Sequence, residues 1–143
     1  MIYPALVTVL ALLMYISFLI NVGRARGKYK VMAPAMSGHI EFEKRLRIQI
    51  NTLEHLIVFI PALWLFGFFW PYSGEFLGVN WIGPHISALV GMVWLGARFA
   101  YATAYCRNPE KRYTAVILSI VCLILLTLGA LTGILSLLYQ HFN

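Results

Sequence analysis

Four long runs of this 143-residue chain contain no Lys, Arg, Asp or Glu, and they constrain its fold more than any other feature: residues 1–23, 55–74, 76–97 and 113–143. Each is about as long as the ~20 residues that a helix needs to cross the hydrocarbon core of a membrane. The runs lack the alternation of a barrel strand, so helices are the predicted spanning elements. We predict an all-α, integral membrane four-helix transmembrane bundle that forms one domain over 1–143, with helices near 3–22, 46–69, 83–106 and 112–139.

The composition excludes the other broad classes of protein. Hydrophobic residues make up 61% of the chain and charged residues 11%, whereas a soluble domain has about 25% charged residues. This excludes a soluble enzyme, a disordered chain and a disulfide-stapled secreted domain. Cys106 and Cys122 are predicted to be free, buried thiols. No basic segment precedes the first apolar run, so we expect a retained helix rather than a cleaved signal peptide.

The basic residues predict how the bundle is oriented. All eleven Lys and Arg residues fall within 24–47 and 98–112, so the net charge of +6 is a topology signal and no nucleic-acid partner is predicted. The positive-inside rule puts both basic connections in the cytoplasm and both termini on the non-cytoplasmic side. A bacterial inner membrane and an endoplasmic reticulum both fit. The compact chain without a retention tail favours the bacterial inner membrane.

Polar residues inside the second predicted helix are the first candidates for a site. Arg47, Asn51, Glu54 and His55 follow i, i+4, i+7 and i+8 and share one helical face. An ionised Glu54 about two turns inside the span costs several kcal/mol unless it is paired, so it is a functional-site hypothesis. The alternative is structural: Arg47 pairs with Glu54 or another neighbour, while Gln49 and Asn51 join helices.

The third predicted helix carries a second polar pattern. Arg98, Tyr101 and Tyr105 follow i, i+3 and i+7, and Arg112 comes seven residues later. Arg98 lies about two turns inside the span and needs a counter-charge, for which Glu54 or a bound anion is available. Because Arg binds carboxylates bidentately, the two patterns predict a small polar ligand with more negative than positive groups. The surrounding lipid would dissolve an apolar second substrate.

These two patterns resemble the membrane-associated eicosanoid and glutathione metabolism (MAPEG) family, which includes microsomal glutathione transferases and leukotriene C4 synthase. The stretch Glu41-Phe-Glu…Arg47-x-Gln-x-Asn51-x-x-Glu54 is similar to the family signature. The spacing of Arg98, Tyr101, Tyr105 and Arg112 is similar to that of the synthase. Two positions depart from the synthase: His55 replaces a tyrosine and Gly27 replaces a second basic residue. They give no support to a specificity for eicosanoids.

The resemblance implies a homotrimer with glutathione as co-substrate, bound between adjacent subunits at the cytoplasmic side. It implies glutathione contacts for Arg26, Arg47, Gln49, Asn51, Glu54, Tyr101 and Tyr105, to which the residue patterns add His55 and Arg98. Arg112 matches the arginine that stabilises the glutathione thiolate. A free thiol of this kind has a pKa of about 8.5, and lowering it by ~2 needs about 2.7 kcal/mol of preferential anion stabilisation. The four histidines lack ligand spacing, so no metal site is predicted.

The predicted function is that of a membrane-bound glutathione transferase whose thiolate attacks a lipophilic electrophile, with glutathione peroxidase activity toward a lipid hydroperoxide as a second outcome. One alternative is a non-catalytic lipid-binding scaffold of the same family. Retention of Arg47, Asn51, Glu54 and Arg112 argues against it. A small proton-coupled exporter is a second alternative, but such proteins carry an essential Glu in their first helix. The first predicted helix here has no charged residue.

Overall fold

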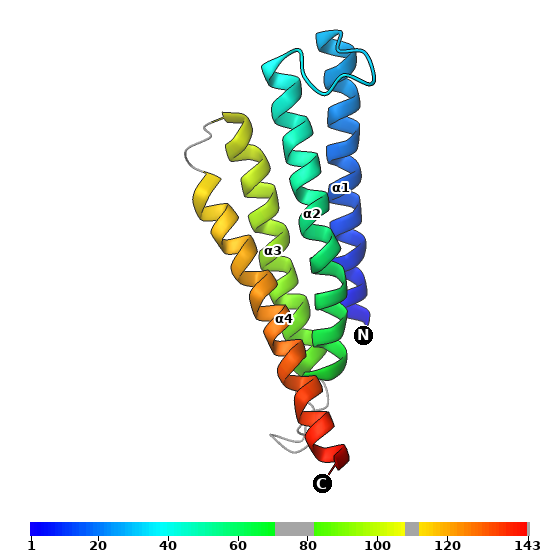
Figure 1. The fold of residues 1–143 in the computed structure, drawn as a ribbon, viewed down its shortest axis with the longest axis vertical. Helices are drawn as coiled ribbons and strands as arrows, with labels where there is room; N and C mark the ends of the chain where they lie inside the picture. The colour runs from blue at the N-terminus through cyan, green and yellow to red at the C-terminus, as the bar shows by residue number, and fades with distance from the viewer. Residues whose placement is uncertain (71–81, 108–111, 143) are drawn as a thin grey trace.

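The computed structural model describes residues 1–70, 82–107 and 112–142, which form four long antiparallel helices (Figure 1). They are α1 (Ile2–Tyr29), α2 (Ile40–Phe69), α3 (Ile82–Arg107) and α4 (Arg112–Phe142). All four are long and apolar enough to cross a membrane. The predicted all-α bundle of four membrane-crossing helices is therefore confirmed in its architecture.

The predicted helix ends at 22 and 46 are wrong, because the charged flanks of the first two spans are also helical. α1 continues to Tyr29 and ends where Lys30 adopts a left-handed conformation with φ 54°. α2 begins at Ile40, after His39, whose ring nitrogen accepts a hydrogen bond from the Glu41 backbone N–H at 3.2 Å. Hydropathy marks where a helix enters lipid, whereas helix formation continues as far as caps and charge pairs support it.

The centre of the bundle is formed by α2 and α3. α1 packs against both of them from one side and α4 from the other, and within the described residues the backbones of α1 and α4 do not come close to each other. At the core, the rings of Phe59 and Trp94 stack with centroids 3.8 Å apart, and Val7, Leu63 and Leu126 are buried around them. Because α1 and α4 each have only one packed side, both display broad apolar faces suited to lipid or to another chain.

Gly129 and Gly133 allow α4 to approach α2 closely. A Cβ atom at Gly129 would lie 2.2 Å from the Phe66 ring, and one at Gly133 would lie 2.1 Å from the Phe69 carbonyl oxygen. This G-x-x-x-G pattern therefore serves packing within one chain, as its residue type predicts for membrane helices.

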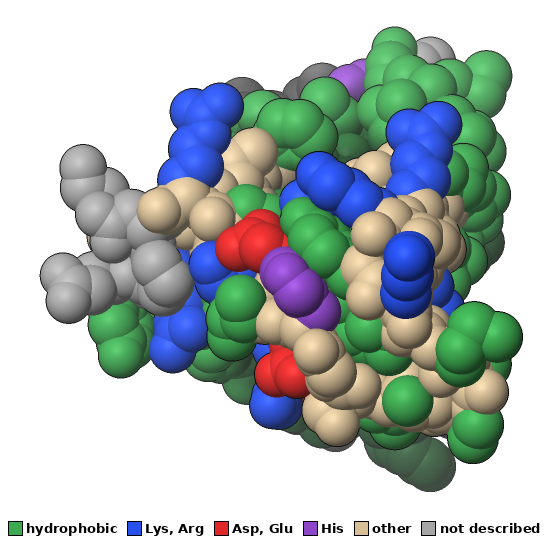
Figure 2. Space-filling model, turned by 90° about the horizontal axis from the view of Figure 1, so that it is seen from above, with side chains coloured by type: hydrophobic (Ala, Val, Ile, Leu, Met, Phe, Trp, Pro, Cys, Tyr) green, Lys and Arg blue, Asp and Glu red, His purple; other side chains and the backbone are tan. Residues whose placement is uncertain are grey.

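The two ends of the bundle differ in character. Both termini lie at the end opposite the α1–α2 connection (Figure 1). We call the other end, where α1 and α3 finish and α2 and α4 begin, the basic end. Seen from there, Lys and Arg side chains surround a few carboxylates (Figure 2). Which end faces the cytoplasm stays a prediction, and Glu75 and Lys111 of the predicted connections lie outside the described residues.

Candidate functional site

Arg98 is the centre of the candidate site, because it joins the polar residues of α2 to those of α3. Its side chain is fully buried, with 0% of its surface exposed. The Nη2 group donates to the Asn51 side-chain oxygen at 3.0 Å and to the Thr52 hydroxyl at 2.8 Å. Among the described residues, its Nε and Nη1 groups have no acceptor. Arg98 is therefore a buried cation with unused donors.

Two tyrosines and a second arginine continue from Arg98 toward the basic end. The Arg98 guanidinium lies over the Tyr101 ring at 4.4 Å, and the ring centroids of Tyr101 and Tyr105 are 5.5 Å apart. The Arg112 guanidinium lies over the Tyr105 ring at 4.9 Å. We call Asn51, Arg98, Tyr101, Tyr105 and Arg112 the polar column. It connects α2, α3 and α4, so the two patterns seen in the sequence meet in one site.

The face of α2 that begins this column also carries Glu54, Arg47 and His55. Asn51 is at the limit of hydrogen-bond distance from the Glu54 carboxylate, at 3.5 Å. Within the described part of the chain, neither Glu54 nor Arg47 forms an ion pair, so the structural alternative in which they neutralise each other is wrong. Both side chains are exposed on the single chain, and Arg47 lies within electrostatic range of Tyr101. Two unpaired charges of opposite sign therefore flank the polar column.

His55 lies one residue further along the same face and is half-buried. Its Nδ1 atom is buried and lacks a hydrogen-bond partner among the described residues. It is within electrostatic range of both Arg98 and Glu54. A buried polar nitrogen without a partner is costly, which makes His55 a further group available to a ligand.

The structure places Gln49 and Arg26 away from the column. The Gln49 amide donates to the Tyr15 hydroxyl at 2.6 Å and so joins α2 to α1. Arg26 donates to the Ala35 carbonyl oxygen at 2.8 Å, and its guanidinium lies over the Phe42 ring at 4.7 Å. The structural interpretation, in which Gln49 and Asn51 each join two helices, is confirmed for both, since Asn51 joins α2 to α3 through Arg98. One chain alone does not bring Gln49 and Arg26 to the column.

The two acidic residues that open the family-like stretch have structural contacts. Glu41 pairs with Lys44 at 2.8 Å and with Arg45 at 3.3 Å, which supports the first turn of α2. Glu43 accepts a hydrogen bond from the Gly38 backbone N–H at 3.0 Å and fixes the preceding connection. These contacts set where α2 begins and hence how its polar face is presented.

The sequence matches the MAPEG family over residues 4–132. The chain belongs to this family. It is 43% identical over 135 residues to an uncharacterised protein of Synechocystis, and the alignment covers 94% of this chain and 90% of the Synechocystis protein. It is 38% identical over 116 residues to mouse microsomal glutathione S-transferase 2, and the alignment covers 81% of this chain and 71% of the mouse protein. It is 33% identical over 132 residues to bovine leukotriene C4 synthase, with 92% and 80% covered.

Two residues that matter in this MAPEG protein were not singled out from the sequence. Thr52 accepts from Arg98 and donates to the Ile48 carbonyl oxygen at 2.7 Å, so it is fully satisfied in the core. A lone Thr in an apolar stretch gives little signal until its neighbour across the interface is known. Tyr15 accepts from Gln49, and nothing in the spacing of α1 pointed to it.

A cavity beside Arg47 enlarges the polar region of the MAPEG chain. Its volume is about 300 Å³. It is lined by Met36, Ser37, Glu43, Leu46, Arg47 and Ile50. The cavity lies where the α1–α2 connection passes the first turns of α2, so a ligand held by Arg47 has room at the basic end.

Proposed function

We propose that this MAPEG protein is a membrane-bound glutathione transferase that activates the glutathione thiol for attack on lipophilic electrophiles. One observation carries the proposal: Glu54 and Arg47 are unpaired within the described chain and flank a buried Arg98 with unused donors. Charged groups at membrane depth are tolerated when they bind partners. A relative named microsomal glutathione S-transferase 2 makes glutathione the partner to test first.

The chemistry of glutathione matches the charges that the site offers. The molecule carries two carboxylates, one ammonium group and one thiol. Arg47 and Arg26 suit the carboxylates because a guanidinium binds a carboxylate through two parallel hydrogen bonds. Glu54 suits the ammonium group, and the Asn51 amide, which Arg98 orients through a hydrogen bond, suits a peptide oxygen. This leaves Arg112, over the Tyr105 ring, for the sulfur.

The proposed reaction begins when the bound thiol loses its proton to water. Arg112 does not accept this proton, because a guanidinium stays protonated at neutral pH. It stabilises the resulting thiolate, with a tyrosine hydroxyl of Tyr105 or Tyr101 as a second donor. The sulfur then forms a bond to the electrophilic carbon, and the displaced electron pair departs with the leaving group or takes a proton from water.

The same thiolate can reduce a lipid hydroperoxide. It attacks the terminal oxygen, the O–O bond breaks, and the lipid alkoxide takes a proton to become an alcohol. The glutathione sulfenic acid then reacts with a second glutathione to give the disulfide and water. Both reactions use one activated sulfur and an apolar partner from the bilayer, so both belong to the proposed activity.

We further propose that the complete site forms between subunits of a homotrimer. Gln49 is two residues from both Arg47 and Asn51, which turns its side chain by about 200° around the helix axis. It therefore lies on the opposite face of α2, against Tyr15 of α1. A ligand held by Asn51 and Glu54 of one chain would meet Gln49 and Arg26 only from a neighbouring chain. The basic end is proposed to face the cytoplasm of a bacterial inner membrane.

Replacing Glu54 with Gln is expected to weaken glutathione binding at least tenfold, because a hydrogen bond to a charged group contributes about 1.5–3 kcal/mol. The measurement is the ultraviolet difference spectrum of purified protein titrated with glutathione at neutral pH, which reports both binding and thiolate formation. Thermal unfolding without ligand should change little, since Glu54 has no ion pair within the described chain.

The matched control is Glu41→Gln, which removes a carboxylate from the same helix but only its pairs with Lys44 and Arg45. Its glutathione affinity should stay within twofold of the unmodified protein. Saturable binding without a thiolate signal would favour peroxidase chemistry gated by the second substrate, or the scaffold alternative. Absence of glutathione binding in the unmodified protein would overturn the proposed function.

Lys28, Lys30 and Lys44 all lie at the basic end, so an amine-reactive reagent can crosslink neighbouring chains there. If the protein is a homotrimer, crosslinking in detergent is expected to stop at three chains. Co-expression then tests whether the site is shared. Chains with Glu54→Gln and chains with Arg26→Gln should each bind glutathione poorly, whereas mixed trimers should regain intact sites. Mixing Glu54→Gln with Asn51→Ala chains should give no recovery. A crosslinked end point of two or four chains contradicts the trimer.

A further inference from the structure

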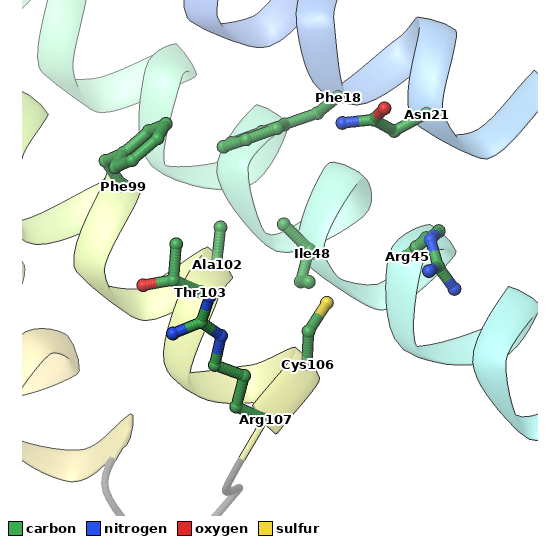
Figure 3. Close-up of a pocket in the computed structure, with 9 residues that line it drawn as sticks. All are labelled: Phe18, Asn21, Arg45, Ile48, Phe99, Ala102, Thr103, Cys106 and Arg107. Carbon is green, nitrogen blue, oxygen red and sulfur yellow. The ribbon is translucent and has the colours of Figure 1, made fainter.

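A second cavity, separate from the polar column, opens between α1, α2 and α3 near the basic end (Figure 3). Its volume is about 270 Å³. Phe18, Ile48, Ala102 and Phe99 supply apolar walls, and Asn21, Arg45, Thr103, Cys106 and Arg107 complete the lining. Ligand pockets commonly measure about 300–1,000 Å³, so this one suits part of an extended molecule.

The cavity faces outward from the bundle. Phe99 is 60% exposed and Thr103 is also exposed, and both lie on the outer side of α3. Arg98, Tyr101 and Tyr105 lie about 100–160° away from these two residues around the same helix axis. The lining residues therefore form an outward-facing recess that shares no residue with the proposed glutathione site.

Positive charge marks the end of the recess nearest the basic end. In Figure 3 the Arg107 side chain runs back along α3 toward Thr103, and Arg45 lies across the recess on α2. Arg45 is already paired with Glu41, which also binds Lys44. Arg107 forms no ion pair within the described residues. The net charge around the recess is therefore positive, because the Arg107 guanidinium beside the apolar wall has no acidic partner among the described residues.

We propose that this recess binds an acidic membrane phospholipid, with its phosphate on Arg107 and Arg45 and one acyl chain along Phe18, Ile48 and Phe99. A guanidinium at the polar boundary of a membrane helix pairs well with a phosphate. A neutral lipid would leave Arg107 uncompensated, and a soluble anion would leave the apolar walls uncovered. An acidic lipid satisfies both parts of the recess.

Cys106 provides a local probe, because it lines the recess. In Figure 3 its thiol points toward Ile48. The other cysteine, Cys122, is buried, with 3% of its surface exposed. The experiment measures the rate at which a membrane-permeant maleimide modifies Cys106 in nanodiscs of phosphatidylcholine, with and without phosphatidylglycerol. We expect the acidic lipid to slow modification about fivefold, equivalent to about 1 kcal/mol of preferential binding.

Arg107→Gln should abolish this protection, whereas Arg24→Gln should retain it. Both replace an exposed arginine near the same end and change the net charge equally, so any general effect of surface charge cancels. Thr103→Trp should fill the exposed mouth and slow modification in either membrane. If Arg107→Gln fails to fold, this variant still shows whether occupying the recess shields Cys106.

Three results would overturn the inference: no protection in the unmodified protein, equal protection in Arg107→Gln, or equal protection by soluble glycerol phosphate in phosphatidylcholine discs. The last would identify a small-anion site in place of a lipid site. Glutathione titration of the same discs is a second readout, since none of the residues that line the recess belongs to the polar column.

Discussion

Arg112→Gln is expected to leave glutathione bound while removing most of its thiolate at neutral pH. In the proposed site Arg112 is the cation nearest the sulfur, so its loss should raise the pKa of the bound thiol by about 2, back toward about 8.5. A thiol that is mostly ionised near pH 7 would then be mostly protonated. Transferase rates at pH 7 should fall between about tenfold and a hundredfold.

The predicted rise in the pKa of the bound thiol implies a specific pH dependence of the rate. Because the variant loses an interaction with the anion only, raising the pH to about 9 should restore thiolate and much of the rate. Arg24→Gln, which changes the net charge equally on exposed α1, should keep the original pH profile. If thiolate persists in Arg112→Gln at neutral pH, another group stabilises the sulfur and the assignment of Arg112 fails.

Arg98→Met is expected to lower glutathione affinity more than tenfold without lowering the melting temperature of the ligand-free protein. Arg98 has 0% of its surface exposed, and its hydrogen-bond acceptors among the described residues are the neutral Asn51 and Thr52. Replacing Arg98 by an apolar side chain of similar length removes the desolvation cost of a buried charge, which offsets the two hydrogen bonds that are lost. The affinity should fall because Asn51 loses the hydrogen bond that orients its amide toward the ligand.

Thermal shift with and without glutathione measures both quantities in one experiment. Thr52→Val is the comparison, since it removes one acceptor but keeps the Arg98 charge. It should lower ligand-free stability by about 1 kcal/mol and affect affinity less than Arg98→Met. A lower melting temperature with unchanged affinity in Arg98→Met would show that Arg98 only braces α2 against α3.

The sequence predicted the spans well and the helix ends poorly. Absence of charge locates the part of a helix that lies in lipid, which is why α3 and α4 match their predicted ranges closely. The extra turns of α1 and α2 depend on the His39 cap and on charge pairs of Glu41, which hydropathy does not record. Periodicity likewise predicted that Arg47, Asn51 and Glu54 share a face.

The spacing of residues along one helix does not show how that helix is rotated against its neighbour. Glu54 was the expected protein partner of Arg98, yet Asn51 and Thr52 accept its hydrogen bonds. A rotation of α2 by one residue decides between these outcomes, and only packing fixes it. For the same reason, the sequence did not show that Gln49 lies against Tyr15, away from the other residues proposed to bind glutathione.

The burial of Arg98 also has a consequence for biogenesis. An arginine inside a membrane span costs up to about 2.5–3.5 kcal/mol on insertion, the value for the helix centre. Arg98 lies about two turns from the end of α3, which is the least apolar of the four candidate spans. Its acceptors, Asn51 and Thr52, are supplied by α2. α3 therefore gains a stable place in the bilayer once α2 is already there, so the order of synthesis along the chain is also the order in which the membrane can accept it.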